Sequence, residues 1–227
     1  MRSEFRGKLD ALVIDLGRTA GLAGRMMTNA TIALHQADLA LAGLVITNRN
    51  QMNAMLDEME QHCITLLALQ APVAGDLRVV IAALRAVGHL RRMGDLARHI
   101  AVLARLKHPK LTVSGKVRPV LARMSLLASQ LAEDAAVAIQ YHDPLSAHRL
   151  AEADEEVDAL RRHLFDVLFA EDWSDGVEQA VDAALIGRYY ERFADHAVAI
   201  AREVCYLATG RIPEPCPLGK VSGSAGG

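Results

Sequence analysis

The sequence predicts an all-α protein, and three observations support that fold class. No proline occurs before Pro72 and none between Pro144 and Pro213. Because proline is excluded from helix interiors, these gaps leave room for long helices. Apolar residues recur at spacings of three and four, and no segment shows sustained period-two alternation. Aromatic residues make up only 4% of the 227 residues, which is low for a sheet protein.

The periodicity and the breaks between periodic segments predict six helices. The first carries a continuous apolar stripe, and the second contains the longest uncharged apolar stretch, residues 39–47. The third and fifth open with Pro72 and Pro144, since the first turn of a helix tolerates proline. The segment 107–115 is the main linker before the fourth helix. The expected ranges are 4–37, 39–69, 72–107, 116–141, 144–170 and 174–209.

The two halves of the chain resemble each other. Three helices of comparable length lie on each side of the linker, which prompts a test for an internal repeat. When the chain is shifted by about 100 residues, "RRMGDLARHIA" (91–101) falls on "ERFADHAVAIA" (191–201), and five of eleven positions are identical. We therefore expect two tandem three-helix bundles related by duplication, with domains at 1–110 and 111–210. The Pro/Gly/Ser-rich tail 211–227 is expected to be flexible.

Composition excludes several classes of protein. A formal net charge of -2 does not fit a dedicated nucleic-acid binder, which usually has a strong basic excess. The N-terminal segment has charges that interrupt any signal peptide, and no apolar stretch approaches the roughly 20 residues of a membrane helix. The three cysteines are unclustered, which fits a reduced compartment. We expect a soluble cytoplasmic protein that reaches a membrane only through partners.

The candidate site is a set of four carboxylates on two helices of the second half. Glu191 and Asp195 lie four residues apart at the edge of the apolar face of the sixth helix, and Asp154 and Asp158 do the same on the fifth. Packed against each other, these helices bring the pairs together, and such a cluster needs compensation. A hard cation such as Mg²⁺, Ca²⁺, Mn²⁺ or iron is one solution. The alternative is neutralisation by neighbouring arginines, namely Arg161, Arg162, Arg188 and Arg192.

The first half does not repeat this cluster. The position that matches Glu191 is Arg91, and only Asp95 keeps the carboxylate of Asp195. The approximate counterparts of Asp154 and Asp158 are Arg49 and Asn53. The sequence therefore predicts one intact acidic cluster, in the second half.

Other chemistry-bearing motifs are weak or missing. The helices have no Glu-x-x-His pair of the kind that di-iron bundles use. We found no phosphate-binding glycine loop, zinc-protease helix motif or nucleophile elbow. The three glycines of "GRTAGLAGR" (17–25) lie within the first predicted helix, where close helix packing is the expected reason for them.

Two motifs resemble signatures of the PhoU family. "PVAGDLR" (72–78) with "LRRMGD" (90–95) resembles the first-repeat signature, in which a helix opens with Pro-Val-Ala-x-Asp-Leu-Arg and ends with Leu-Glu-Arg-Ile-Gly-Asp. "YERFADHA" (190–197) resembles the second-repeat version, Leu-Glu-Arg-Ile-Gly-Asp-His-Ala. The resemblance covers residues 4–209, and the composition of the first repeat resembles actinobacterial members.

The resemblance implies a regulator and not an enzyme. PhoU proteins are cytoplasmic accessory proteins of the phosphate-specific ABC transporter. They link its ATPase to the sensor histidine kinase of a two-component system, and they keep the phosphate-starvation response off when phosphate is plentiful. Family members have two three-helix bundles and often form homodimers. We therefore expect protein partners and no nucleic-acid partner.

Some family members bind iron or zinc clusters through Glu/Asp-x-x-x-Asp motifs on the bundle surface. Carried over to this sequence, the metal ligands are Asp154, Asp158, Glu191 and Asp195, with Asp95 as a remnant of a first site. Arg91 departs from the motif, and it is expected to make the first-repeat face a basic contact surface. Two readings of the intact cluster stay open: a metal site, in a binding protein or a carboxylate-bridged metalloenzyme, or a metal-free acidic surface for a basic partner.

Overall fold

The computed structural model describes residues 2–113, 115–143 and 145–211, which form six α-helices and no strand. Each helix lies close to its expected range. The helices are α1 (Arg2–Gln36), α2 (Leu39–Gln70), α3 (Ala74–Lys107), α4 (Arg118–Tyr141), α5 (Ser146–Leu168) and α6 (Gly176–Thr209). The last four, α3 to α6, each begin two residues later than expected. Pro72 precedes α3 instead of lying in its first turn, and Pro144 lies outside the described residues.

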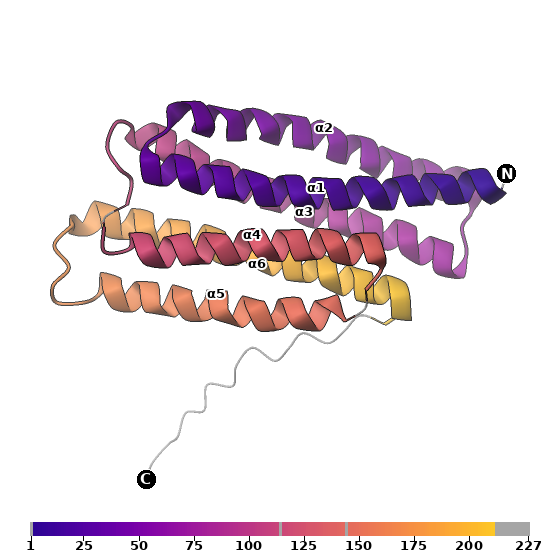
Figure 1. Cartoon of the computed structure of the whole chain (residues 1–227). Helices are drawn as coiled ribbons and strands as arrows, with labels where there is room; N and C mark the ends of the chain where they lie inside the picture. The colour runs from indigo at the N-terminus through magenta and orange to yellow at the C-terminus, as the bar shows by residue number, and fades with distance from the viewer. Residues whose placement is uncertain (1, 114, 144, 212–227) are drawn as a thin grey trace, which may run out of the picture.

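The helices form two three-helix bundles side by side, as the duplication predicted. Figure 1 shows α1, α2 and α3 in the upper half and α4, α5 and α6 in the lower half. Within each bundle every helix contacts the other two, and the bundles meet through α1 against α4 and α3 against α6. Buried apolar side chains from both bundles make one continuous cluster. The boundaries of separate domains at 110 and 210 therefore stay a prediction.

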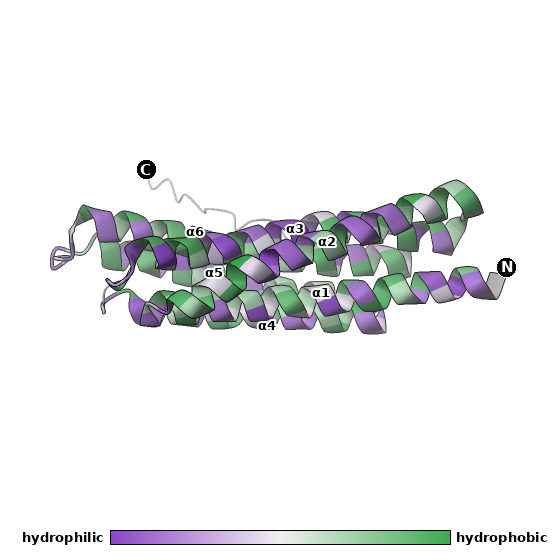
Figure 2. Ribbon diagram, turned by 90° about the horizontal axis from the view of Figure 1, so that it is seen from above, coloured by the Kyte–Doolittle hydropathy of each residue, from purple (hydrophilic) through white to green (hydrophobic). Residues whose placement is uncertain are grey.

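The hydropathy pattern explains why the helices assemble this way. Figure 2 shows hydrophobic and hydrophilic residues interspersed along the helices of both bundles, as expected for helices that bury one face and expose another. On α1 the buried stripe includes Leu12, Leu16, Ala20, Ala23 and Met27, as the three-and-four spacing predicts.

Glycine allows α1 and α4 to approach closely. A Cβ on Gly24 would lie 3.2 Å from the Cβ of Ala132, and one on Gly17 would lie 3.4 Å from the carbonyl oxygen of Ala136. The packing role expected for these two glycines is therefore confirmed. Gly21 is different, since its nearest neighbour is the side chain of Arg25 on the same helix.

A buried chain of hydroxyl groups ties the two bundles together. The Tyr190 hydroxyl on α6 lies 2.8 Å from Thr31 Oγ1 on α1, which in turn lies 2.7 Å from Ser125 Oγ on α4. Tyr190 is completely buried, so its polar group needs these partners.

We expect Tyr190→Phe to lower the free energy of unfolding by about 1 kcal/mol, the usual net worth of a buried hydrogen bond. The measurement is denaturant unfolding, with Tyr189→Phe at the adjacent, partly buried position as the control. A stability equal to that of the wild type would show that the hydroxyl chain does not hold the bundles together.

Candidate functional site

The structure brings the four expected acidic residues together between α5 and α6. Asp154 and Asp158 lie on α5, and Glu191 and Asp195 lie on α6, in two helices that pack against each other. Burial and the charges of Asp195, Asp158 and Glu191 raise the pKa of Asp154 from 3.8 to about 7. Burial and the charge of Glu191 also raise the pKa of Asp195. Burial and the neighbouring carboxylates therefore disfavour ionisation of Asp154, which is partly protonated near pH 7.

Glu191 is the member of the cluster that is paired with two arginines. Its carboxylate accepts a hydrogen bond from Arg161 Nη1 on α5 at 3.2 Å and pairs with Arg188 one turn earlier on α6. Glu191 is 7% exposed, so it lies inside the packed face and not just beyond its edge as the helical wheel placed it. Of the four arginines named as possible counter-ions, these two act on Glu191.

The other carboxylates are left largely without counter-ions. Arg192 Nη1 approaches Asp195 only to 4.0 Å, on an exposed edge where such a pair contributes little. The Oδ1 atom of Asp154 is buried and accepts no hydrogen bond from any residue that the structure describes. The sequence suggested that either a bound cation or neighbouring arginines would neutralise the cluster. Arginines pair with Glu191 but not with Asp154.

The equivalent place in the first repeat contains an ion pair. Arg49 on α2 is 4% exposed, and its Nε and Nη2 atoms donate to Asp95 Oδ1 on α3 at 2.9 and 2.7 Å. Its Nη1 atom donates to Asn53. The alignment of the two halves predicted that these positions correspond to the acidic cluster. It did not predict that they bind one another.

Arg91 does not make the basic contact surface that was expected of it. Its guanidinium donates to Asp57 at 2.8 Å and to Glu60 at 3.1 Å, both on α2. The charge of Arg91 is therefore already shared with two exposed carboxylates of the same bundle.

His196 is turned away from the acidic cluster, towards α3. Its Nδ1 atom lies 3.1 Å from Nδ1 of His89 across the junction of the two bundles. Burial is the main cause that lowers the pKa of His196 to about 4, and the charges of His89, Arg192 and Arg92 add to it. The ring is therefore neutral at physiological pH and is not a partner for the carboxylates.

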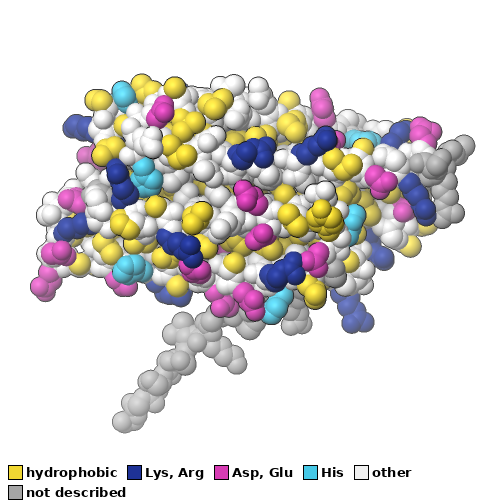
Figure 3. Space-filling model, viewed as in Figure 1, with side chains coloured by type: hydrophobic (Ala, Val, Ile, Leu, Met, Phe, Trp, Pro, Cys, Tyr) yellow, Lys and Arg dark blue, Asp and Glu magenta, His cyan; other side chains and the backbone are white. Residues whose placement is uncertain are grey.

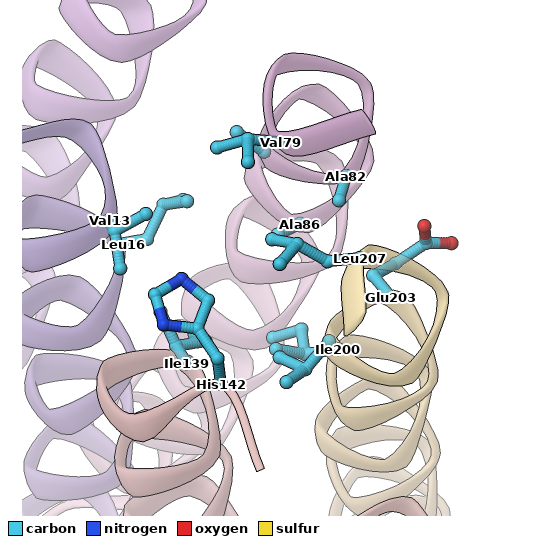
Figure 4. Close-up of a pocket in the computed structure, with 12 residues that line it drawn as sticks. Val13, Leu16, Val79, Ala82, Ala86, Ile139, His142, Ile200, Glu203 and Leu207 are labelled. Atoms are coloured by element: carbon cyan, nitrogen blue, oxygen red, sulfur yellow. The ribbon is translucent and has the colours of Figure 1, made fainter. Parts of the chain in front are cut away.

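Two other regions of the molecule are weaker candidates. On the face formed by α1 and α4, basic and acidic side chains are interspersed without a continuous area of one sign (Figure 3). At the junction of α1, α3, α4 and α6 a small pocket is lined mainly by apolar side chains (Figure 4). Its interior volume of about 20 Å³ is room for a single water molecule and not for a phosphate ion.

Each of the two bundles matches the same family of known proteins. The family model described as "PhoU domain" matches the chain twice, at residues 16–104 and 121–204. The chain belongs to the PhoU family. When the starts of the two matches are aligned, Arg49 on α2 corresponds to Asp154 on α5. When their ends are aligned, Asp95 on α3 corresponds to Asp195 on α6.

Relatives and solved structures agree with this assignment. The chain is 44% identical over 213 residues to a Mycobacterium tuberculosis protein named phosphate-specific transport system accessory protein PhoU homolog 2, covering 94% of this chain and 100% of the relative. It is also 44% identical to PhoU homolog 1 of Mycobacterium leprae, covering 94% and 96%. The crystal structure of PhoU from Pseudomonas aeruginosa superposes with a TM-score of 0.82 at 26% identity, covering 91% of this chain and 100% of that one.

A second similar crystal structure is that of the phosphate transport system regulatory protein PhoU from Streptococcus pneumoniae. It gives a TM-score of 0.81 at 27% identity, and it covers 93% of this chain and 100% of that chain. The PhoU chain described here therefore has the family fold over nearly its whole length. Among the described residues, no helix is long and apolar enough to cross a membrane.

Proposed function

We propose that this chain is a negative regulator of phosphate uptake and phosphate-starvation signalling. In this proposal it contacts the ATPase subunit of the phosphate ABC transporter and the sensor histidine kinase of the two-component system, as a cytoplasmic homodimer. The main support for this proposal is the 44% identity over 213 residues to a phosphate-specific transport system accessory protein. The proposed role is regulatory and involves no catalytic step.

The geometry supports function through protein contacts. The acidic cluster lies on two long helices, and the Oδ1 atom of Asp154 has no hydrogen-bond donor among the described residues. Charged surfaces of this kind set the orientation and the association rate of a partner more than its affinity.

Deletion of the gene tests the proposed function directly. We expect phosphate-starvation genes to be expressed in phosphate-rich medium after deletion, and to be silenced again by the wild-type gene on a plasmid. The double variant Asp154→Asn/Asp195→Asn should restore silencing poorly, while Glu155→Gln, at an exposed position of the same helix, should restore it fully. Unchanged expression in the deletion strain would contradict the proposal.

A metal site at Asp154, Asp158, Glu191 and Asp195 is the second candidate. The oxygen donors and the unpaired Oδ1 atom of Asp154 suit a hard cation. The arrangement suits it less well, because Glu191 is held by two arginines. Among the residues described, no group of three or more acidic, histidine or cysteine side chains is placed to hold a metal ion.

Elemental analysis tests the metal hypothesis. If the cluster holds a metal, protein purified without chelator contains it, and Asp158→Ala and Glu191→Ala each lose it. Metal-free wild-type protein under these conditions would remove both the metal site and the metalloenzyme alternative, and it would leave the regulatory proposal intact.

A further inference from the structure

We propose that the apolar groove between the end of α5 and the start of α6 binds a basic amphipathic segment of a partner protein. The groove lies at the end of the second bundle where the chain passes from α5 to α6, on the left of Figure 1. The proposal rests on the proposed function, because it names the chemistry of a protein contact through which that function works.

Helical spacing lines both walls of the groove with apolar side chains. At the end of α5, Phe165 and Phe169 are four residues apart, and their rings stack with the centroids 5.8 Å from each other. On α6, Val177, Val181 and Ala184 follow at spacings of four and three, so they share one face. The two helices thus form a groove of about 600 Å³ that their own side chains leave open.

Trp173 fixes the connection between the two helices at the end of the groove. Its backbone N–H donates to the carbonyl oxygen of Ala170 at 2.9 Å, and its indole Nε1 donates to the carbonyl oxygen of Gly176 at 3.1 Å. Because the indole has no other polar group, its ring contributes an apolar surface to the groove. A groove that is formed in advance costs a partner less to bind.

The lining of the groove suits side chains of another protein better than a small molecule. Phe169 is 81% exposed and Val177 is 80% exposed, and they lie beside each other and not singly on the surface. Among the described lining residues, Ser174 is the one with a polar side chain that is free to bind, whereas a small-molecule site usually has several convergent polar groups. Aromatic side chains in such grooves carry much of the binding energy of protein interfaces.

The charge around the groove indicates which partner it accepts. The stretch 164–187 contains no Lys, Arg or His, and its six acidic residues are Asp166, Glu171, Asp172, Asp175, Glu178 and Asp182. Two lysines, Lys107 and Lys116, pair with three of them. The other three, Asp166, Glu171 and Asp175, form no ion pair with any residue that the structure describes. A partner with basic residues beside its apolar ones complements this charge.

Arg161 marks the inner end of the groove. Its guanidinium lies over the ring of Phe165, 5.6 Å from the centroid, and donates to Glu191 at 3.2 Å. Because this cation already has a carboxylate partner, it leaves the acidic charge at the outer end uncompensated. The basic residues of the partner are therefore expected over the connection between the helices, and its apolar residues in the groove.

The same charge disfavours the other occupants of an apolar groove. In a symmetric dimer formed through this face, each copy would set its acidic residues against those of the other, because both copies use the same patch. An anionic membrane surface would be repelled in the same way. A basic segment of a different protein is the occupant that remains.

Photocrosslinking tests which molecule occupies the groove. The photoreactive residue p-benzoyl-phenylalanine replaces Phe169 in the full chain, and the control is its placement at Tyr141, an exposed aromatic residue at the opposite end of the bundle. In cells grown with ample phosphate, we expect position 169 to crosslink to a peptide of another protein with Lys or Arg at helical spacing beside apolar residues. A crosslink to a second copy or to an acidic peptide, no crosslink, or the same products from both positions would overturn the proposal.

A synthetic probe tests the chemistry with purified protein. The probe is a fluorescently labelled helix with leucine on one face and lysine on the other, and a second helix has glutamate in place of lysine. We expect Phe169→Ser/Val177→Ser to bind the lysine helix about tenfold more weakly than the wild type. Tyr141→Ser/Leu145→Ser, at two other exposed apolar positions, is the control and should bind like the wild type. Circular dichroism checks that both variants keep their helices.

The dependence on charge provides the contrary outcome. The glutamate helix should bind more weakly than the lysine helix, and added salt should weaken binding of the lysine helix. Equal binding of the two helices, or equal binding of the lysine helix by the groove variant and the wild type, would overturn the proposal.

The gene deletion separates this proposal from the proposed function. If phosphate-starvation genes stay silent in the deletion strain, the proposed function fails, whatever the probe shows. If deletion induces these genes and Phe169→Ser/Val177→Ser silences them as fully as the wild type does, only the groove proposal fails. We expect this variant to silence them poorly and Tyr141→Ser/Leu145→Ser to silence them fully.

Discussion

Asp154→Asn is expected to raise the free energy of unfolding by roughly 2 kcal/mol at about pH 8. In the folded protein, burial and three neighbouring carboxylates raise the pKa of Asp154 from 3.8 to about 7. Each unit of that shift is worth about 1.4 kcal/mol when the group must ionise, and partial access of water reduces the total. An amide keeps the shape of the side chain and removes the charge.

The raised pKa of Asp154 also predicts how the free energy of unfolding changes with pH. Because the pKa is raised on folding, the folded state binds more protons than the unfolded state between about pH 4 and 7. The contribution of Asp154 to stability is therefore complete below its unfolded pKa and is lost as the pH rises through 7. Denaturant unfolding across this range should give a flatter profile for Asp154→Asn than for the wild type. Glu155→Gln is the control, and identical profiles for all three proteins would contradict the account.

Arg49→Met is expected to lower the free energy of unfolding by roughly 2 kcal/mol. The substitution keeps an unbranched side chain in the core and leaves the carboxylate of Asp95 without its guanidinium. Loss of one partner of a buried ion pair usually costs more, but the Asp95 side chain is 35% exposed and water can replace part of the interaction.

A double-mutant cycle separates the ion pair from the packing of Arg49. Stability is measured for Arg49→Met, for Asp95→Asn and for the two together, and the coupling energy is the departure from additivity. We expect the double variant to be clearly more stable than the sum of the single changes suggests. Additive effects would mean that Arg49 contributes through its aliphatic stem alone.

The long helices could be predicted because their signals are local. Proline-free gaps and apolar residues at spacings of three and four fix where each helix lies to within a few residues. The third and fifth helices were expected to begin at Pro72 and Pro144 and begin two residues later, because proline is tolerated both inside the first turn and just before it. The pairing of α1 with α4 and of α3 with α6 was not predicted, since it depends on contacts between residues far apart in the chain.

The sequence predicted which four carboxylates form the acidic cluster, but not which of them would be paired with arginines. Spacing places Glu191 beside Asp195, but only the packing of α5 on α6 decides that Arg161 reaches Glu191 and leaves Asp154 unpaired. The role of Arg49 was missed, although its signal was present. A lone arginine in the buried row of α2, between Val45 and Met52, needs an acidic partner.

The most direct test of the regulatory account is an affinity purification of the tagged protein from cells grown in high and in low phosphate. We predict that the ATPase subunit of the phosphate transporter and the phosphate sensor kinase are retained by the wild type, in amounts that change with phosphate supply. Asp154→Asn/Asp195→Asn should retain less of at least one of them, and Glu155→Gln should match the wild type. Retention of neither protein under both conditions would contradict the account.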